Sequence, residues 1–389
     1  MPATPRRALV VVFVARALLA RRMESDWRRM ADDIGPAKIV VVRDPAAALE
    51  GVVVVDNVAC GPAIGGIRMA SDVTVAEVAR LARAMTFKNA AAGLAHGGGK
   101  GGIVADPRMP RTEKERVIRA FGRAIRNLVD YIPGPDMGTD ETCMAWLQDE
   151  IGRAVGLPPV LGGIPLDTIG ATGFGLAACA EVAQEFAGIP LRGARVAVQG
   201  FGAVGRHAAR FLAARGAVLV AASDLGGAIV NPDGLDVERL AAFKAERGGL
   251  RDFPDGRALA GEELIGVDCD IWIPAARPDV IDASNAPRLR ARLVLQGANI
   301  PATLDAEAIL HARGVLSVPD FIANAGGVIC AAVEYHGGTQ AQAFAVIDEK
   351  LRANTRAVLT RARDAAILPR AAAVELARTR VAEAATYRR

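Results

Sequence analysis

The sequence is poor in aromatic residues, and its basic and acidic residues nearly balance. Aromatic side chains make up 4% of its 389 residues, and 47 basic residues stand against 43 acidic ones. A nucleic-acid-binding surface needs basic clusters interleaved with aromatic side chains. Because the basic residues here are spread along the chain, we expect no nucleic-acid partner.

Histidine and cysteine are also scarce. The four histidines and five cysteines are scattered, with no paired spacing of the kind that holds zinc or forms a redox motif. An odd number of cysteines argues against a disulfide framework. We therefore expect no metal site, reduced cysteines in the core and a cytoplasmic location.

Long apolar runs are missing as well. No segment reaches the ~18 uninterrupted apolar residues that a membrane-spanning helix needs, so we expect no membrane partner. Residues 1–23 carry five arginines and no acidic residue, and Arg16 interrupts their apolar stretch. This segment fits a targeting peptide, an upstream start or a basic amphipathic helix, and the sequence does not decide among the three.

The sequence is rich in glycine (41 residues) and has an apolar fraction of 51%, which is typical of a globular protein. Its length is sufficient for two domains. Valine-rich runs predict strands, and Thr74 followed by Glu77 predicts a capping box at a helix start. The pattern predicts strands at 38–42 and 51–56, a turn-rich stretch at 57–69, helices at 74–92, 113–130 and 174–187, a loop at 131–141, and a helical tail at 340–389.

We expect two α/β domains with the active site in the cleft between them. Residues 1–155 would form a substrate-binding domain, completed by helices within 335–389. Residues 156–334 alternate strands and helices, which predicts a Rossmann-type, doubly wound parallel sheet that binds a dinucleotide.

The dinucleotide signal is a glycine-rich turn between a strand and a helix, in RVAVQGFGAVGRHAARFLAARGAVLVAASD at 195–224. The glycines let the backbone turn tightly beside a pyrophosphate, and the helix N-terminus attracts its charge. The acid that ends the second strand suits ribose hydroxyls and favours NAD, although the glycines after it leave room for NADP. The predicted cofactor-binding residues of this motif are Gly200, Gly202, Ala203, Val204, Gly205 and Asp224.

Two lysines stand in unusual settings in MTFKNAAAGLAHGGGKGG, residues 85–102. Lys88 continues an apolar helical stripe, so it needs an anionic partner unless its head reaches water. Lys100 follows three glycines, which leave room for a ligand, and burial beside another cation would lower its pKa and let it act as a base. Asp136, in the loop at 131–141, would be its proton partner, and Lys88 would hold a substrate carboxylate. Beside a dinucleotide, this set indicates hydride transfer on an anionic substrate.

Seven motifs carry a family resemblance: GPAIGGIRM, MTFKNAAAGLAHGGGKGG, PGPDMGTD, ATGFG, QGFGAVG, QGANIPAT and PDFIANAGGVICAAVEY. Over residues 50–340 the chain resembles the glutamate, leucine, phenylalanine and valine dehydrogenases. The resemblance implies NAD(P)-dependent reversible oxidative deamination of an L-amino acid to its 2-oxo acid and ammonia by a homo-oligomer.

The resemblance also implies roles for individual residues. Lys88 would bind the α-carboxylate, Lys100 would activate water, and Asp136 would exchange protons with the amino group. The positions that match the family around the nicotinamide and its ribose are Thr172, Asn299 and Asn324.

The side-chain pocket departs from the glutamate enzymes at two positions. Ile64 stands where they have a lysine, and Ala331 stands where they have a serine. A carboxylate without partners is unfavourable in an apolar pocket, so we expect an apolar side chain of the leucine, valine or phenylalanine type. Resemblance to the leucine and phenylalanine enzymes implies a pocket lined by Ile64, Gly65, Gly134, Val328 and Ala331.

Three further hypotheses stay open. The segment VLGGIPLDTIGATG resembles the glutamate branch of the family, which keeps glutamate as a candidate substrate. A catalytically inactive dinucleotide-binding regulator is a second hypothesis, because a fold alone does not fix a function. A dehydrogenase that acts on hydroxy acids is the third.

Overall fold

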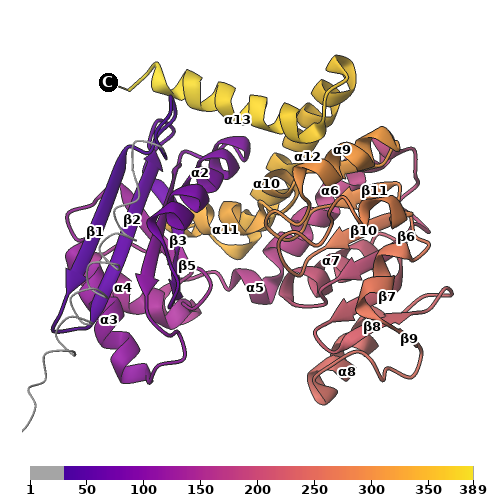
Figure 1. Cartoon of the computed structure of the whole chain (residues 1–389), viewed down its shortest axis with the longest axis horizontal. Coiled ribbons are helices and arrows are strands. Elements are labelled where there is room, and N and C mark those ends of the chain that lie inside the picture. Colours follow the sequence, from indigo (N-terminus) through magenta and orange to yellow (C-terminus); the bar gives the residue numbers. More distant parts are fainter. Residues whose placement is uncertain (1–29, 389) are drawn as a thin grey trace, which may run out of the picture. The chain divides into compact units, whose positions relative to one another are not determined.

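The structure, a computed structural model, describes residues 30–388 and shows two compact units (Figure 1). The first runs to Thr86 and includes Ala95–Leu161, and the second consists of Phe87–Leu94 and Gly162–Arg389. The C-terminal helices thus group with the second unit, and the division at 155/156 into functional domains stays a prediction. The three hypotheses for residues 1–23 concern a segment outside the described residues.

The first unit is built on a five-stranded sheet of order β1-β2-β4-β3-β5. Strands β1, β2 and β4 pair antiparallel, whereas β3 runs parallel to both β4 and β5. The strands are β1 (Lys38–Asp44), β2 (Leu49–Asn57), β3 (Ala63–Ala70), β4 (Gly97–Val104) and β5 (Tyr131–Pro135). The helices are α2 (Val75–Ala91), α3 (Arg111–Ala124), α4 (Glu141–Ile151) and the short η2 (Pro159–Leu161).

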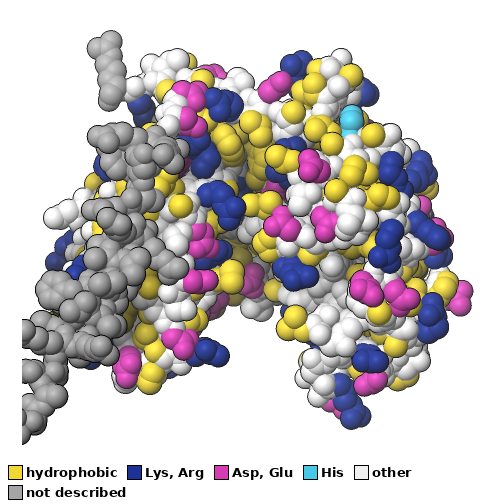
Figure 2. Space-filling model, in the orientation of Figure 1, with side chains coloured by type: hydrophobic (Ala, Val, Ile, Leu, Met, Phe, Trp, Pro, Cys, Tyr) yellow, Lys and Arg dark blue, Asp and Glu magenta, His cyan; other side chains and the backbone are white. Residues whose placement is uncertain are grey.

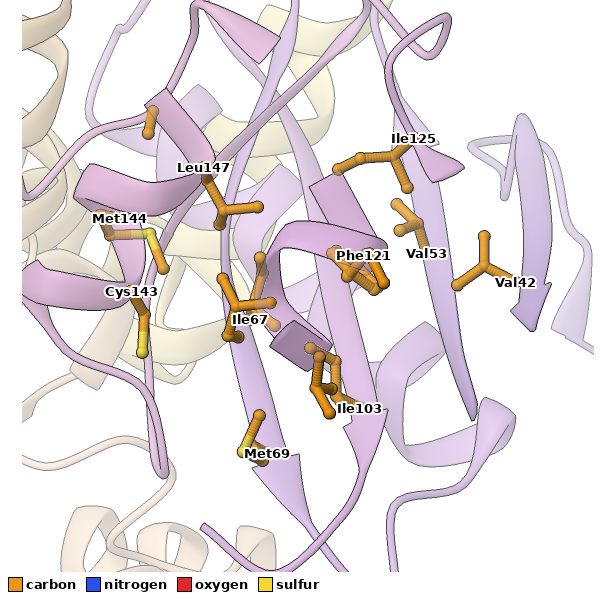
Figure 3. Close-up of a cluster of buried hydrophobic side chains, with 14 of the residues drawn as sticks. Val42, Val53, Ile67, Met69, Ile103, Phe121, Ile125, Cys143, Met144 and Leu147 are labelled. Atoms are coloured by element: carbon orange, nitrogen blue, oxygen red, sulfur yellow. The ribbon is translucent and has the colours of Figure 1, made fainter. Parts of the chain in front are cut away.

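Both faces of this sheet are buried, which explains the unbroken valine run of β2. Side chains alternate across a strand, so Val53 and Val55 join one hydrophobic cluster while Val52 and Val54 join another. The first cluster includes Phe121 from α3 and is drawn in Figure 3, where side chains from α3 and α4 point toward the strands. The second cluster lies under the first turns of α2.

Strand β4 shows why a glycine run was needed in the sheet. A Cβ at Gly98 would lie 2.0 Å from the backbone nitrogen of Thr86, and one at Gly97 would lie 1.9 Å from the carbonyl oxygen of Asn57. Helix α2 therefore rests directly on β4, and neighbouring backbone crowds the strand. The glycines serve this packing and do not form an open ligand-facing loop.

Two segments predicted as turn-rich or loop contain strands. Residues 57–69 include most of β3, and residues 131–141 include β5. Proline cannot donate to a ladder, but β5 is an edge strand, where Pro133 and Pro135 need no partner on their outer side. The predicted strands at 38–42 and 51–56 and the helix at 74–92 are confirmed as β1, β2 and α2.

The second unit has a seven-stranded sheet of order β12-β11-β10-β6-β7-β8-β9. Its strands are β6 (Arg195–Gln199), β7 (Val218–Asp224), β8 (Gly227–Val230), β9 (Arg257–Leu259), β10 (Ile271–Pro274), β11 (Leu293–Leu295) and β12 (Leu316–Val318). The five strands from β12 to β7 are parallel, as predicted for a doubly wound sheet, but β8 and β9 pair antiparallel at one edge.

The chain leaves β6 toward β7 on one side and later returns to β10 on the other. Parallel sheets bind ligands at this switch point, outside the carboxyl ends of the strands.

The helices of this unit are α5 (Leu166–Ile169), α6 (Ala171–Ala187), α7 (Ala203–Ala213), α8 (Val237–Arg247), η3 (Gly261–Gly266), η4 (Ala286–Arg288), α9 (Leu304–Ala312), α10 (Asp320–Ala323), α11 (Gly326–Tyr335), α12 (Gln340–Ala365) and α13 (Pro369–Ala385).

Candidate active site

Lys100 lies on the α2 face of strand β4, between Gly98 and Gly102. Alternation places these three residues on one face, and a Cβ at Gly102 would meet Val78 of α2 at 2.7 Å. The ammonium group is almost wholly buried, with 7% of the side chain exposed. A charge in such a place needs a partner of opposite sign.

That partner is Asp136, which follows the edge strand β5. Lys100 Nζ lies 3.0 Å from Asp136 Oδ2, and both residues belong to the first unit. The loop that carries Asp136 is fixed by Thr139, whose hydroxyl accepts from the Asp136 backbone nitrogen and donates to the carbonyl oxygen of Ile67. The structure therefore brings the predicted base and its predicted proton partner into contact.

Arg68 is a second cation at this carboxylate, although it is not among the site residues predicted from the sequence. Its Nε donates to Asp136 Oδ2 at 3.0 Å, and its Nη1 donates to Glu77 Oε1 at 2.6 Å. Glu77 thus directs its carboxylate to Arg68, while the Thr74 hydroxyl caps α2 as predicted by accepting from the Glu77 nitrogen. Strand alternation was the available signal, because Arg68 lies four residues after Ile64 on the same face.

The cluster lowers the pKa values of both Lys100 and Asp136. Burial lowers the pKa of Lys100, and the charge of Arg68 adds to this, while Asp136 opposes it without cancelling it. Burial alone would raise the pKa of Asp136, but the charges and hydrogen bonds of Lys100 and Arg68 outweigh it, so the carboxylate stays ionised. The predicted direction for Lys100 is confirmed, with burial as its main cause.

Three predicted pocket residues lie in the first unit. Ile64 is 3% exposed and shares the α2 face of β3 with Arg68. Gly65 and Gly134 have packing reasons of their own, because a Cβ at Gly65 would lie 1.6 Å from the carbonyl oxygen of Gly99, and one at Gly134 would lie 3.0 Å from Val155. The other two residues, Val328 and Ala331, lie on α11 in the second unit.

Lys88 stands in the last turn of α2 and groups with the second unit. Its Nζ lies 3.4 Å from Asn299 Oδ1. The end of this helix is held by a basic residue of α13, because Arg380 donates to the carbonyl oxygens of Ala90 and Ala91. Cations at a helix C-terminus are favourable, so the C-terminal helix fixes the turn that presents Lys88.

The glycine-rich turn has the geometry that a dinucleotide requires. Gly200 adopts φ +90°, where a side chain would be strained, and a Cβ at Gly205 would lie 2.2 Å from the carbonyl oxygen of Gly200. A Cβ at Gly202, by contrast, would meet nothing within 4 Å. Gly200 therefore makes the turn, Gly205 lets α7 pack on β6, and Gly202 leaves space for a phosphate at the α7 N-terminus, which begins with Ala203 and Val204.

Asp224 ends β7 as predicted, but it is paired. Lys244, on α8, places Nζ 3.2 Å from Asp224 Oδ2 and donates to the carbonyl oxygen of Phe201 at 2.9 Å. The other oxygen of Asp224 accepts from the Gly226 nitrogen at 2.8 Å. A cation beside the carboxylate predicted to bind the ribose would weaken the repulsion between that carboxylate and a 2′-phosphate.

The three predicted nicotinamide-side residues are all in the second unit. Asn324 Nδ2 donates to the carbonyl oxygen of Ala298 at 3.1 Å and to Asn299 Oδ1 at 3.2 Å. Thr172 lies beside the start of α11, since a Cβ at Gly327 would stand 3.2 Å from its hydroxyl. Lys88, Asn299 and Asn324 therefore form one chain of contacts.

The sequence also led to predictions about cysteine, histidine and metal binding. Four cysteines are buried, Cys60 is half-buried, and none of these five thiols forms a disulfide. His96 is buried, with Nδ1 3.1 Å from the carbonyl oxygen of Pro62. Among residues 30–388, no cluster of side chains suits a metal and no helix is long and apolar enough to cross a membrane. On the face drawn in Figure 2, basic and acidic side chains lie interspersed over the described part of each unit.

Two family models match the chain. One, described as Glutamate/Leucine/Phenylalanine/Valine dehydrogenase, matches residues 162–389. The other, described as Glu/Leu/Phe/Val dehydrogenase, dimerisation domain, matches residues 36–153. Together they cover both units.

Named relatives agree with these models. The chain is 41% identical over 356 residues to the glutamate dehydrogenase of Thermotoga maritima, covering 86% of this chain and 85% of the relative. It is 41% identical over 293 residues to the NADP-specific glutamate dehydrogenase of Saccharolobus shibatae, covering 72% and 69%. It is 39% identical over 340 residues to the catabolic NAD-specific glutamate dehydrogenase of Bacillus subtilis, covering 82% and 80%.

Among solved structures, the hetero-hexameric glutamate dehydrogenase of Thermus thermophilus in its leucine-bound form is similar, with a TM-score of 0.83 and 30% identity. The match covers 99% of this chain and 98% of that one.

Proposed function

The chain belongs to the glutamate/leucine/phenylalanine/valine dehydrogenase family, and from this premise we propose how its residues act. It is an amino acid dehydrogenase that uses NAD or NADP. We propose that Lys100 and Asp136 carry its acid–base chemistry in the reversible oxidative deamination of an L-amino acid to the 2-oxo acid and ammonia. The observation that carries this proposal is their buried ion pair of 3.0 Å.

The roles follow from charge and burial. Lys88 holds the α-carboxylate as a fixed positive charge. NAD or NADP, when bound at the glycine-rich turn, supplies the acceptor for the hydride from Cα. Lys100 in its neutral form takes a proton from the water that attacks the iminium carbon, and Asp136 exchanges protons with the departing amino group. Arg68 keeps Asp136 ionised between turnovers.

Glutamate is our first candidate substrate. The relatives at 39–41% identity are named glutamate dehydrogenases, and their names give no support to the apolar preference predicted from the sequence. Family membership at this identity over most of the chain outweighs two pocket positions as a guide to the substrate class.

An apolar L-amino acid is the second candidate because of two specific observations. Ile64 and Ala331 are 3% and 7% exposed, and neither carries a group that could pair with a second carboxylate. Within the cluster on β3 and β4, the charges of Lys100 and Arg68 are already matched by Asp136 and Glu77. The γ-carboxylate of glutamate would therefore meet no positive charge in this cluster that is not already neutralised.

The test is initial-rate reduction of NAD and of NADP with L-glutamate, L-leucine, L-valine, L-phenylalanine and L-tryptophan, and the reverse reaction with and without ammonia. Turnover of glutamate supports the first candidate, and turnover of apolar substrates alone supports the second. A protein that binds NADH but oxidises none of the five would be a regulator, and a reverse reaction that ignores ammonia would indicate a hydroxy-acid dehydrogenase. Either result would overturn the proposal.

Replacing Ile64 with lysine is expected to lower KM for glutamate by about tenfold or more, because a charge-assisted hydrogen bond contributes about 1.5–3 kcal/mol. The same change should raise KM for leucine. Steady-state kinetics with both substrates would measure it, with Ile64→Leu as the matched control that keeps volume and polarity. Unchanged KM values for both substrates would mean that Ile64 does not line the side-chain pocket.

We further propose that NAD is preferred and NADP accepted, with Lys244 as the residue that admits the 2′-phosphate. Lys244→Met should raise KM for NADP by about tenfold, because it restores the full charge of Asp224, while KM for NAD changes by less than about threefold. Arg247→Met is the control, since this residue of α8 is 67% exposed. An equal change for both coenzymes would contradict the assignment.

An oligomer is part of the proposal. Residues 36–153 match a model described as a dimerisation domain, and the similar Thermus thermophilus structure is titled hetero-hexameric. Light scattering of the purified chain would test whether it forms a homo-oligomer, and a monomeric mass would exclude one.

A further inference from the structure

The loop that carries Asn299 contains a backbone conformation that its residue type does not favour. Ile300, the next residue, has φ +49°. A β-branched residue at positive φ is a true outlier and persists only where its surroundings impose it. Its side chain is 37% exposed, so packing of that side chain does not provide the restraint.

The restraint comes from hydrogen bonds to the Ile300 backbone. Asp320 Oδ2 accepts from the Ile300 nitrogen at 2.9 Å, and the Ile300 carbonyl oxygen accepts from the Asp279 nitrogen at 2.9 Å. Asn324, which follows α10, bonds to Ala298 and to the Asn299 side chain. The segment from Asp320 to Asn324 therefore holds all three residues of the loop at 298–300.

Asp320 is in turn held from the C-terminal helix. Arg370, at the start of α13, places Nη2 3.0 Å from the second oxygen, Asp320 Oδ1. The guanidinium donates hydrogen bonds to both oxygens of Glu307, at 2.6 Å and 2.7 Å, and to Gln296 Oε1 at 3.0 Å. The side chains of Asp320 and Glu307 are only 8% and 6% exposed. Arg370 is thus a half-buried cation shared by two buried carboxylates.

We propose that Arg370 is a positioning residue for the nicotinamide side of the coenzyme site, acting on Asn299 through Asp320 and the strained turn at Ile300. The inference rests on the proposed function, because it takes Asn299 to contact the nicotinamide half of the coenzyme. It gives the C-terminal helix a role in coenzyme binding beyond packing. Arg370, Asp320 and Ile300 lie in one unit, so the path of contacts is complete within it.

The test compares binding of NADH with binding of ADP, which occupies only the half of the site formed by the glycine-rich turn and Asp224. Arg370→Lys keeps a cation beside the two carboxylates but loses the forked contacts. We expect it to weaken NADH binding by about tenfold while ADP binding changes by less than about twofold. Fluorescence titration and calorimetry would measure the two affinities. Arg361→Lys is the control, because Arg361 of α12 pairs with Glu375 of α13, as Arg370 pairs with carboxylates, but is 58% exposed.

A second variant separates positioning from general stability. Glycine adopts positive φ freely. In Ile300→Gly, the turn can therefore form without the restraint that Asp320 and Arg370 impose on Ile300. In that background, Arg370→Lys should weaken NADH binding by less than about threefold, which a double-mutant cycle would show. A purely stabilising Arg370 would give equal losses for NADH and ADP and no rescue by glycine, and either result overturns the inference. Equal affinity of the wild type for NADH and ADP would instead remove its premise, because the nicotinamide half would then contribute nothing.

Discussion

Replacing Lys100 with methionine is expected to lower kcat by about 10³-fold or more, because a general base contributes about 10²–10⁴. Methionine keeps the length of the side chain in a site where only 7% of it is exposed. Asp136 retains Arg68 as a partner in the variant, so no carboxylate is left without a cation. The loss should therefore be one of chemistry and not of folding.

The measurement is saturating NAD(P) reduction together with NADH binding and thermal unfolding. Lys38→Met is the matched control, since Lys38 is a lysine of the same unit whose side chain is 50% exposed and pairs with Asp130. NADH affinity should be unchanged in both variants, because the glycine-rich turn lies in the second unit. A decrease in kcat smaller than about tenfold would exclude Lys100 as the base.

The glycines around Lys100 show what the sequence could and could not predict. Three glycines before a lysine directed attention to Lys100, which the structure places in contact with Asp136, but taken alone they suggested open access for a ligand. In the structure Gly98 and Gly102 bring α2 onto the strand, and this close approach also buries Lys100 between them. Glycine has low β propensity, so local pattern cannot reveal a central strand whose glycines are required by a helix distant in the sequence.

Arg68 illustrates a limit of a different kind. Its pairing with Asp136 joins residues 68 positions apart, and no local signal specifies that the loop after an edge strand returns to this point. The dinucleotide motif was predicted well because its strand, turn, helix and acid are contiguous, and each glycine has a local steric reason. The strained turn at Ile300 had no signal at all, since its restraint comes from Asp320 and, through it, from the C-terminal helix.

Replacing Asp136 with asparagine is expected to lower kcat by about 10²-fold or more and to move the pH dependence of the remaining activity to lower pH. Asp136 attracts the proton of Lys100 and so raises its pKa, whereas Arg68 and burial lower it. Without the carboxylate, only the lowering influences and the more distant Glu77 remain. Lys100 should then lose its proton at lower pH than in the wild type.

The pH dependence of kcat/KM distinguishes Lys100→Met from Asp136→Asn. In the wild type, kcat/KM should rise with pH as Lys100 deprotonates, with a pKa below the ordinary lysine value of 10.5. This rising limb should disappear in Lys100→Met. In Asp136→Asn it should persist but move to lower pH. Profiles of kcat/KM against pH would measure both. Asp140→Asn is the control, because Asp140 caps α4 by accepting from the Cys143 nitrogen at 2.9 Å, and asparagine caps a helix equally well. A limb that stays in place would mean that Asp136 does not act on the Lys100 proton, and a limb displaced upward would contradict the predicted sign of the shift.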